Sequence, residues 1–323
     1  MDFSISILDL ATVRYQQPIG EALAYSLELA QLADELNYKR LWFAEHHNFQ
    51  SIASSATSVL IGHIAAHTKR IRVGAGGIML PNHPPLVIAE QFGTLAELYP
   101  DRIDLGLGRA PGTDHQTMRA LRRDHNAADT FPQDVLELQS YLSDQTQDSG
   151  VYAYPGRGTN VPLYILGSSL FGARLAAQLG LPYAFASHFA PQMLIQAAEV
   201  YRNEYKPSER FPEPYMIAAL SVIAADSQEE ADAHYEKAGR ARVRMMLGRG
   251  RKLSDEEVEL LYHSAAGQQV LQMLHYRAVG TPEVVADQLL EFQRLCGADE
   301  LMITNLAVEI PAQRRTLQLV ATL

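Results

Sequence analysis

The sequence predicts a closed (β/α)8 barrel, the TIM-barrel fold. Segments with strand character and segments with helix character alternate from the first residues onward, giving eight strand and helix pairs in strict order. The predicted strands are short, continuous apolar runs, which is typical of strands buried on both faces of a parallel sheet. Polar residues and glycines gather directly after the strands and not before them, as in barrels that bind ligands at one rim.

Hydrophobic periodicity defines the individual elements. In residues 21–37, for example, Ala22, Leu29, Ala33 and Leu36 fall on one helical face. The strands are expected at residues 3–10, 40–45, 71–80, 102–108, 161–167, 182–187, 214–225 and 300–307. The helices are expected at 21–37, 55–68, 86–99, 131–142, 171–180, 191–205, 281–296 and 311–323, with one more beginning near Ser227.

One barrel accounts for residues 1–323 as a single domain, because the chain shows no internal repeat, low-complexity segment or interdomain linker. The long interruption is 248–280, an insertion after the seventh strand. It either acts as a lid over the site or forms a surface insertion without a role. A doubly wound open sheet is the alternative fold.

Composition limits the class of protein. Hydrophobic residues make up 47% and charged residues 20% of the chain, which fits a globular protein and gives no sign of disorder. The formal net charge of −10 argues against a nucleic-acid partner, because such proteins concentrate basic residues on one surface. The basic segment 242–252 is either a solvated, mobile loop or an anion-binding site.

A cytoplasmic location is expected. The one cysteine, Cys296, leaves no internal disulfide and suits a reducing compartment. The first residues, MDFSISILDLA, contain no basic segment or small-residue cleavage site and fit a first strand. No apolar stretch reaches the roughly 18 residues that a membrane span needs, so no membrane partner is expected.

Candidate site residues follow the predicted strands. In chain order they are Asp9; Glu45, His46 and His47; the glycine-rich residues 74–77 and His83; Arg109; Ser168 and Ser169; and His188. The ends of barrel strands converge on one rim, so these side chains are expected around one site. Adjacent residues of a strand point to opposite faces, which prevents His46 and His47 from holding one ion together.

Two local motifs do not fit their usual functions. GLGRAPG (106–112) resembles a dinucleotide-binding loop, but its third glycine comes one residue late and Pro111 interrupts the turn. His63 and His67 have the spacing of a helical zinc site, but Ile64 stands where a metalloprotease needs glutamate, and no third ligand is evident. We therefore expect no metal site.

GSSLFGA (167–173) lies between a predicted strand and a helix start, where free backbone N–H groups and the helix dipole favour a phosphate. Ser168 and Ser169 fit such a site, or serve only as helix caps. Arg109 on the neighbouring rim loop adds a planar fork that pairs with phosphate oxygens. The combination favours a phosphate site.

The glycines of GAGGIMLPNHPP (74–85) have two interpretations. A backbone without Cβ atoms permits the close approach of a flat ligand. It equally permits tight packing against a neighbouring strand, and the sequence does not choose between them.

Four long segments make the chain resemble the bacterial-luciferase-like flavin monooxygenase family, especially its single-subunit branch. They are WFAEHHN (42–48), VGAGGIMLPNHPPLVIAEQFGTL (73–95), RIDLGLGRAPGTD (102–114) and LGSSLFGARLAAQLGLPYAFASHF (166–189). The similarity runs over essentially the whole chain, and such segments in fixed order are far more specific than any single motif. The family fold is the (β/α)8 barrel reached above from the residues.

The resemblance implies a reduced flavin mononucleotide (FMN) at the C-terminal rim. Family members seat the flavin ring against a non-prolyl cis peptide in the third strand, which would fall between Gly76 and Gly77. The residues implied near the phosphate are Arg109, Ser168, Ser169 and the backbone of Gly172.

His46 matches the family's catalytic histidine. In the implied reaction, reduced FMN and O2 oxygenate a small organic substrate, and an imidazole beside the flavin holds or moves a proton near neutral pH. A hydrogen-bonded structural histidine is the alternative. The residues expected to orient His46 or to line the substrate pocket are Asp9, Glu45, His47 and His188.

The resemblance implies a monooxygenase that receives reduced FMN from a separate flavin reductase, since no nicotinamide site is recognisable. The alternatives are hydride transfer with a deazaflavin (F420) cofactor and a flavin-binding protein without catalysis. Luciferase has a bulky aromatic after the sixth strand where this chain has Ser187, His188 and Phe189, so its aldehyde pocket and light emission are not carried over. Small and apolar residues on two helices favour a homodimer: Ala56, Ile61, Ala65, Ile88 and Phe92.

Overall fold

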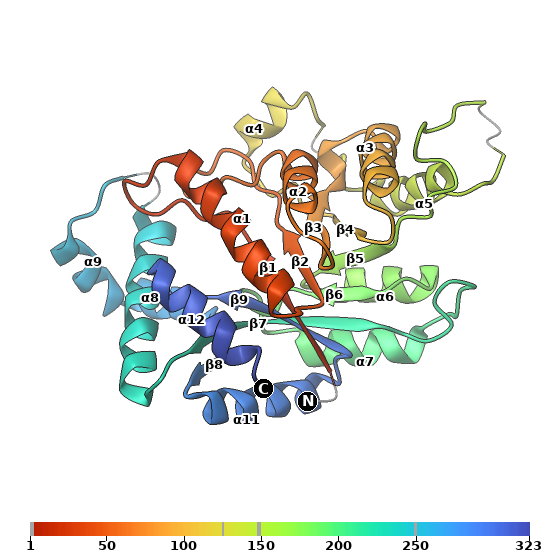
Figure 1. The fold of residues 1–323 in the computed structure, drawn as a ribbon. Helices are drawn as coiled ribbons and strands as arrows, with labels where there is room; N and C mark the ends of the chain where they lie inside the picture. The colour runs from red at the N-terminus through yellow and green to blue at the C-terminus, as the bar shows by residue number, and fades with distance from the viewer. Residues whose placement is uncertain (1–2, 125, 147–149, 249–250) are drawn as a thin grey trace.

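The computed structural model describes residues 3–124, 126–146, 150–248 and 251–323, and it confirms the predicted closed barrel. Eight parallel strands follow one another around the wall in chain order, and pairing of β6 with β7 closes it. Figure 1 shows helices packed around the outside of these strands. The barrel strands are β1 (Ser4–Asp9), β2 (Arg40–Phe43), β3 (Arg72–Met79), β4 (Ile103–Gly108), β5 (Leu163–Gly167), β6 (Tyr183–Phe185), β7 (Met216–Ala224) and β9 (Glu300–Asn305).

The helices around the wall begin and end close to their expected positions. They are α1 (Ile19–Glu35), α2 (Thr57–Ala66), α3 (Pro85–Leu98), α5 (Phe131–Leu142), α6 (Leu170–Leu179), α7 (Leu194–Glu204), α11 (Pro282–Cys296) and α12 (Ile310–Val320). Two short elements that the sequence did not predict lie in the loops after β3 and β4: the 3-10 helix η1 (Leu80–Asn82) and α4 (His115–Ala120). Asp114 caps α4, since its side chain accepts a hydrogen bond from the backbone N–H of Thr117 at 2.8 Å.

The hydrophobic core has two layers because alternate strand residues face opposite sides of the wall. Ile7, Leu41 and Phe43 belong to the large cluster between strands and helices. Leu8 and Trp42, their neighbours in sequence, belong to a smaller cluster inside the barrel. The remaining buried members of the inner cluster come from the other end of β2 and from β5, β6, β7 and β9: Ala44, Tyr164, Ala184, Ile217, Ala219 and Met302.

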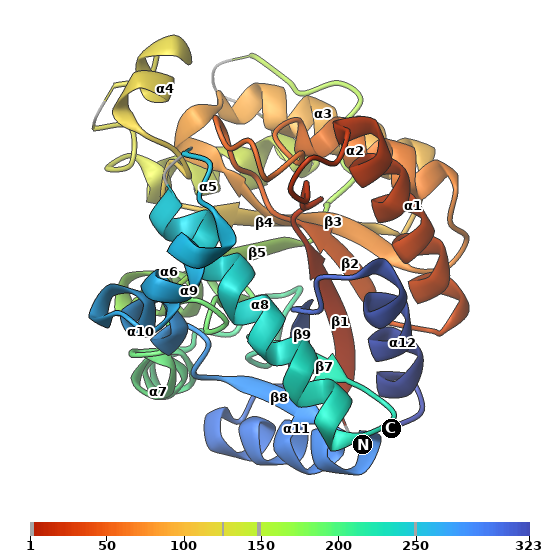
Figure 2. The same cartoon turned by 90° about the vertical axis from the view of Figure 1, so that its left-hand side faces the viewer.

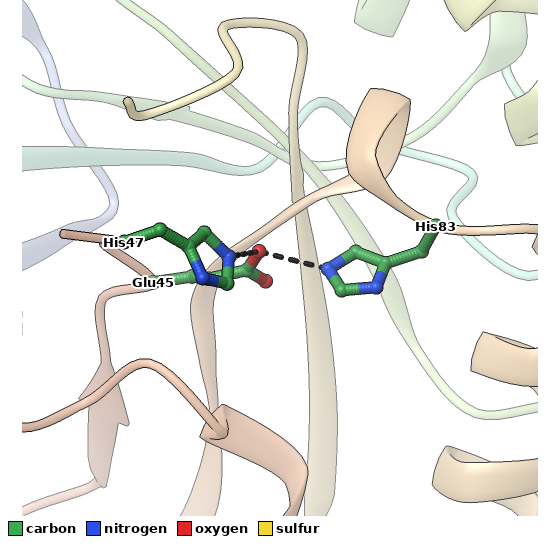
Figure 3. A group of neighbouring side chains, drawn as sticks. All are labelled: Glu45, His47 and His83. Atoms are coloured by element: carbon green, nitrogen blue, oxygen red, sulfur yellow. Dashed lines mark hydrogen bonds and ion pairs between the residues drawn. The ribbon is translucent and has the colours of Figure 1, made fainter. Parts of the chain in front are cut away.

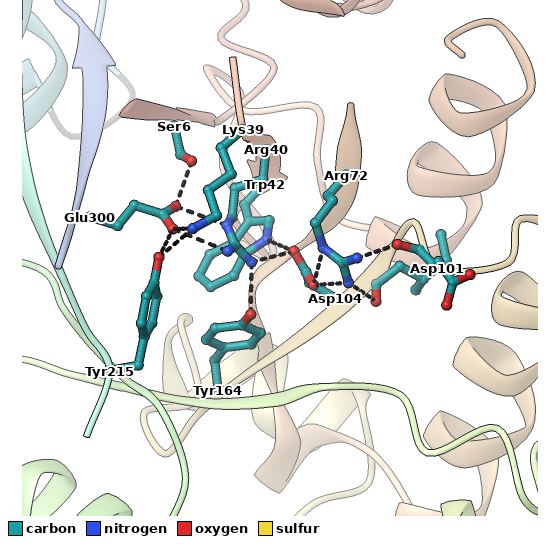
Figure 4. Close-up of polar contacts among 11 residues, drawn as sticks. Ser6, Lys39, Arg40, Trp42, Arg72, Asp101, Asp104, Tyr164, Tyr215 and Glu300 are labelled. Atoms are coloured by element: carbon teal, nitrogen blue, oxygen red, sulfur yellow. Dashed lines mark hydrogen bonds and ion pairs between the residues drawn. The ribbon is translucent and has the colours of Figure 1, made fainter. Parts of the chain in front are cut away.

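The amino-terminal end of the barrel is filled by a buried polar network (Figure 4). Arg40 donates hydrogen bonds to Glu300 at 2.8 and 3.1 Å, to Asp104 at 2.7 Å and to the hydroxyl of Tyr164 at 2.8 Å. Arg72 adds a second ion pair to Asp104 at 2.6 Å. These charged residues are the first or second residues of their strands. At this end of a TIM barrel, side chains usually stabilise the fold and do not take part in catalysis.

The helix after β7 packs against the end of that strand, where its Ala231 and Ala238 share a small buried cluster with Ile223, and it then continues past the strand. Figure 2 shows α8 (Gln228–Gly248) crossing in front of the carboxyl-terminal end of the strands. Its side chains contact loops at that end: the guanidinium carbon of Arg244 lies 5.8 Å from the ring centroid of Tyr15, which follows β1. Lys237 donates to Glu309, which follows β9, at 2.8 Å. The helix therefore spans the mouth.

The predicted insertion 248–280 lies after β7, as expected. It contains α9 (Asp255–Tyr262), α10 (Ala265–Gln272) and the short strand β8 (Arg277–Gly280), which pairs with the end of β7. Residues 249 and 250, which belong both to this insertion and to the basic segment, lie outside the described residues. The lid role of the insertion stays a prediction.

The residues named as a dimer contact were wrong in most cases. Ile61, Ala65, Ile88 and Phe92 are at most 1% exposed because α2 and α3 bury them against the protomer's own strands. Of the five residues, Ala56 alone is exposed, as a subunit contact requires.

Across the described residues, no helix combines the length and the apolar character that crossing a membrane requires.

Candidate active site

The residues that follow β2 divide between two sides of the chain. Glu45 is the shared partner of His47, two positions later in the chain, and of His83, which follows η1 (Figure 3). One oxygen of Glu45, Oε1, lies 2.8 Å from Nε2 of His47 and 2.8 Å from Nε2 of His83. The other oxygen accepts the backbone N–H of Met79 at 3.2 Å. The buried carboxylate thus joins the ends of β2 and β3.

Glu45 is 1% exposed and remains ionised. Burial raises the pKa of its carboxyl group, but hydrogen bonds from His47 and His83 outweigh this, and the pKa lies below its ordinary value. The two imidazoles are thereby fixed in place at the carboxyl-terminal end of the barrel.

Glu45, His47 and His83 also place three potential metal-ligand atoms within 4.8 Å of one another. Two imidazoles and a carboxylate are a donor set that zinc accepts. In the structure, however, Nε2 of each imidazole forms a hydrogen bond with the carboxylate oxygen Oε1 of Glu45. These three atoms therefore already have partners without a metal ion. The sequence predicted no metal site, and no local pattern in it groups these three residues.

His46 is not a member of this cluster. Burial lowers the pKa of its imidazole, and a hydrogen bond to the backbone of Gly112 opposes the shift without cancelling it. Nδ1 is buried and has no hydrogen-bond partner among the described residues. The ring packs edge-on against Phe49, with the centroids 5.6 Å apart. His46 is therefore a neutral imidazole with one nitrogen free at pH 7.

The loops after β2 and β4 are joined, which brings His46 and Arg109 to the same end of the barrel. Thr113 donates to the backbone oxygen of His47 at 3.2 Å, and Asn48 donates to Asp114 at 3.1 Å. These contacts lie four and five residues beyond Arg109 in the chain. The loops that carry His46 and Arg109 therefore contact each other at this end of the barrel.

Arg109 and the start of α6 form an open cationic surface. The guanidinium carbon of Arg109 lies 4.2 Å from the ring centroid of Phe171, in the first turn of α6. Arg109 is exposed and has no acidic partner in the described part of the chain. Ser169 occupies the N-cap position but makes no side-chain cap hydrogen bond. The capping interpretation of Ser169 is therefore not supported, and its hydroxyl is free.

The hydroxyl of Ser168 is likewise without a hydrogen-bond partner among the described residues, and it directly precedes Ser169. Gly172 is buried on α6, where a Cβ would lie 3.3 Å from the ring of Tyr183. The first N–H groups of a helix have no partner within the helix. The two hydroxyls and the first amides of α6 are thus close to the guanidinium of Arg109, and groups of these kinds fit a phosphate.

The Gly76–Gly77 peptide is cis, as the family resemblance implied. Both glycines pack tightly: a Cβ on Gly77 would lie 2.6 Å from the backbone oxygen of Gly106, and one on Gly76 would lie 2.9 Å from Leu8. The packing interpretation of the glycine-rich segment is therefore sufficient to explain these residues. Pairing of β3 with β4 shifts register between Ala75 and Ile78 at the same place.

The other predicted site residues have different surroundings. Asp9 accepts hydrogen bonds from Ser26 at 2.6 Å and from the backbone of Ala11 at 2.9 Å, so both of its oxygens are engaged. Burial raises the pKa of Asp9, and these hydrogen bonds oppose the shift. His188 has a buried Nδ1 without a partner among the described residues. Burial, and to a smaller extent the charge of Arg242, lowers its pKa to about 3.

Sequence reasoning missed two features of this end. Glu45 and His47 lie beyond the end of β2 at Phe43, so strand alternation does not fix their orientation, and no local signal joined them to His83. Arg242 on α8 lies near His188, and only its place in a basic segment marked it.

Fold and site together define a (β/α)8 barrel whose carboxyl-terminal end carries the neutral imidazole of His46 and, next to the start of α6, the guanidinium of Arg109. A model of the luciferase-like monooxygenase family matches residues 1–299. The chain belongs to the luciferase-like monooxygenase family, a family of oxidoreductases.

Relatives of similar length support this assignment. A luciferase-like monooxygenase of Escherichia coli strain K12 is 45% identical over 319 residues, covering 98% of this chain and 95% of the relative. The N-acetyl-S-alkylcysteine monooxygenase of Bacillus subtilis strain 168 is 33% identical over 296 residues, covering 88% and 87%. The crystal structure of apo-MsnO8 superposes with a TM-score of 0.87 at 35% identity, covering 99% of this chain and 98% of that one.

Two distant barrels show a likeness of fold alone. The oxygenating component of 3,6-diketocamphane monooxygenase from Pseudomonas putida, in complex with FMN, is 15% identical with a TM-score of 0.73, covering 99% and 97%. An F420-dependent secondary alcohol dehydrogenase is 15% identical with a TM-score of 0.71, covering 99% of each chain. Solved structures of this fold thus include both FMN and F420 proteins.

Proposed function

We propose that the protein is an FMN-dependent monooxygenase that oxygenates a small organic substrate. The observation that carries the proposal is the sharing of one barrel end by His46 and the cradle of Arg109 and Ser169. When bound, reduced FMN supplies two electrons to O2, so that one oxygen atom enters the substrate and the other leaves as water.

The cradle would hold the FMN phosphate. Arg109 provides two parallel N–H donors, and the first turn of α6 provides backbone N–H groups beside the free hydroxyls of Ser168 and Ser169. In the structure, Arg109 rests on the ring of Phe171, which keeps the guanidinium at the helix start without using its donors for an acidic side chain.

His46 would hold or move a proton at Nδ1, the nitrogen left without a partner. Because its pKa is lowered by burial, the imidazole is neutral at pH 7 and can accept a proton or, through the tautomer, donate one. Glu45 and His47 would act as positioning residues, since their hydrogen bonds fix the chain on either side of His46.

Thioethers are the first substrate class to test, because the Bacillus subtilis relative is named for N-acetyl-S-alkylcysteine oxidation. Asp9 and His188 would border the substrate together with Glu45 and His47. The α8 helix would limit access of water, since it spans the mouth.

A separate flavin reductase would supply reduced FMN, as the sequence analysis inferred from the lack of a recognisable nicotinamide site. We also retain the homodimer as a proposal, although the contact must use exposed residues of α2 and α3 such as Val59 and Leu98 and not the buried ones. Sedimentation of the purified protein measures this directly.

The experiment supplies the protein with photoreduced FMN and ¹⁸O2 and follows a panel of thioethers by mass spectrometry. Incorporation of one ¹⁸O atom into a product, absent without the protein, supports a monooxygenase. Hydride transfer with reduced F420 under anaerobic conditions, without FMN-dependent oxygenation, would establish the deazaflavin alternative. FMN binding without either reaction would establish a flavin-binding protein without catalysis.

A further inference from the structure

Besides Arg109, a second arginine at the mouth of the barrel, Arg242, has no acidic partner among the described residues. In the basic segment 242–252, Arg244 donates to the backbone oxygen of Leu253 and to the carboxylate of Asp255. Arg242, two residues earlier on α8, has no hydrogen bond and no ion pair to any residue that the structure describes. The segment is therefore neither uniformly solvated nor uniformly paired.

Both arginines are partly exposed, and they differ in their partners. Its Nε atom is buried and has no hydrogen-bond acceptor in the described residues. Its side chain lies near His188, because its positive charge contributes to the lowered pKa of that imidazole. His188 follows β6, so Arg242 faces the carboxyl-terminal end of the barrel.

A buried guanidinium N–H without an acceptor is unfavourable, since its hydration is lost and not replaced; in Arg242 this N–H is the one on Nε. Burial lowers the pKa of Arg242, and no neighbouring acid opposes this. The neighbouring His188 is neutral and brings no compensating charge. An anion bound to Arg242 would supply the missing hydrogen-bond acceptor and the missing negative charge.

The phosphate of FMN would not supply this anion. Arg109 and Ser169, which would bind the phosphate, belong to the end of β4 and the start of α6. Arg242 approaches from α8, beside the residue that follows β6. Two cationic groups on different elements indicate two anionic groups at this end of the barrel.

We propose that Arg242 binds a carboxylate of the organic substrate, with His188 contributing a hydrogen bond. This inference rests on the proposed function, because it assigns the substrate class of that same site. A planar guanidinium donates two parallel hydrogen bonds to a carboxylate. Nδ1 of the neighbouring His188 is buried and has no hydrogen-bond partner among the described residues. The protein thus selects carboxylate-bearing substrates over neutral ones of the same shape.

The test measures equilibrium binding to the protein with oxidised FMN, so that no turnover is needed. Each probe of a panel of N-acetyl-S-alkyl- and N-acetyl-S-arylcysteines is compared with its primary carboxamide by isothermal titration calorimetry. We expect at least one carboxylate to bind about tenfold or more tightly than its amide. In Arg242→Gln, this preference should disappear, whereas Arg242→Lys should retain part of it.

Arg244→Gln is the matched control, because it removes the same charge from the same helix at a residue already paired with Asp255. It should keep the preference for the carboxylate. Circular dichroism and thermal unfolding show whether each variant is folded. Equal binding of acids and amides across the whole panel would overturn the proposal, as would loss of the preference in Arg244→Gln alone.

A second measurement separates the substrate from the flavin. Arg242→Gln should bind FMN with less than about a twofold change, whereas a loss of FMN affinity with unchanged riboflavin affinity would assign Arg242 to the phosphate and overturn the inference. If the proteins show the carboxylate preference but no oxygenated product, the monooxygenase proposal fails while the anion site stands.

Discussion

Nε2 of His83 lies 2.8 Å from Oε1 of Glu45, although 38 positions separate the two residues in the chain. The same oxygen meets His47, so one buried carboxylate fixes the loops after two adjacent strands. The catalytic candidate His46 lies between Glu45 and His47 in sequence, so its position depends on the hydrogen bonds that Glu45 forms with His47 and His83.

We predict that Glu45→Gln lowers the free energy of unfolding by about 1–3 kcal/mol at pH 7, because a buried charge-assisted hydrogen-bond acceptor is lost. The folded pKa of Glu45 lies below its ordinary value of 4.5. The stabilisation is thus present above pH 4.5 and is lost as pH falls through the folded pKa. Urea unfolding between pH 7 and pH 3.5 measures both effects.

The control for this change is Glu97→Gln, which alters an exposed carboxylate on α3. It should change the free energy of unfolding by less than about 0.5 kcal/mol. Equal destabilisation by the two substitutions would contradict a special role for the Glu45 anchor.

We expect His46→Ala to bind FMN but to form product about 10²- to 10⁴-fold more slowly, because it removes a positioned proton carrier. His63→Ala, at an exposed histidine of α2, should leave turnover unchanged. Burial lowers the pKa of His46 below its ordinary value of 6.5, so the acid limb of a kcat profile that depends on neutral His46 should fall below pH 6.5. Unchanged turnover in His46→Ala would refute the role.

Arg109→Gln should weaken FMN binding about tenfold or more and change riboflavin binding little, since riboflavin lacks the phosphate. Fluorescence titration of both ligands measures the difference. Arg119→Gln, at an exposed arginine of α4, is the control and should affect neither. Equal losses for both ligands in Arg109→Gln would show that the arginine contacts the ring and not the phosphate.

Ser169→Ala should weaken FMN binding while changing the free energy of unfolding by less than about 0.5 kcal/mol, because the hydroxyl makes no cap hydrogen bond in the structure. A destabilisation near 1 kcal/mol or more without an effect on FMN would restore the capping interpretation.

At the opposite end of the barrel, Arg40→Met should lower the free energy of unfolding by about 3–5 kcal/mol, because it leaves Glu300 and Asp104 buried without their shared cation. The affinity of the folded protein for FMN should not change. Arg314→Met, which removes an exposed ion pair with Glu28, should cost less than about 1 kcal/mol. Similar losses in both variants would contradict the importance of burial.

The fold was largely predictable because its signals are local. Short apolar strands alternating with amphipathic helices require a parallel sheet covered by helices, and the barrel follows from eight such pairs. The convergence of His46 and Arg109 was also predictable, since both follow strands whose carboxyl ends meet at one rim.

Other features depend on contacts that the sequence does not encode locally. Arg40, Asp104 and Glu300 form one network only because the register of separate strands brings them together. The path of α8 across the mouth was not predicted, because its period indicates a helix but not the surface that it covers. The burial of Arg242 depends on that path, so the basic segment alone could not distinguish a solvated loop from an anion site.

The buried ion network fills one end of this molecule, and the reactive side chains occupy the other. Loops and side chains around the reactive end can therefore be exchanged, by evolution or by design, while the buried ion network at the other end keeps the molecule folded. Libraries of variants confined to the segments after β2, β4, β5 and β6 should yield altered chemical preferences far more often than collapsed proteins.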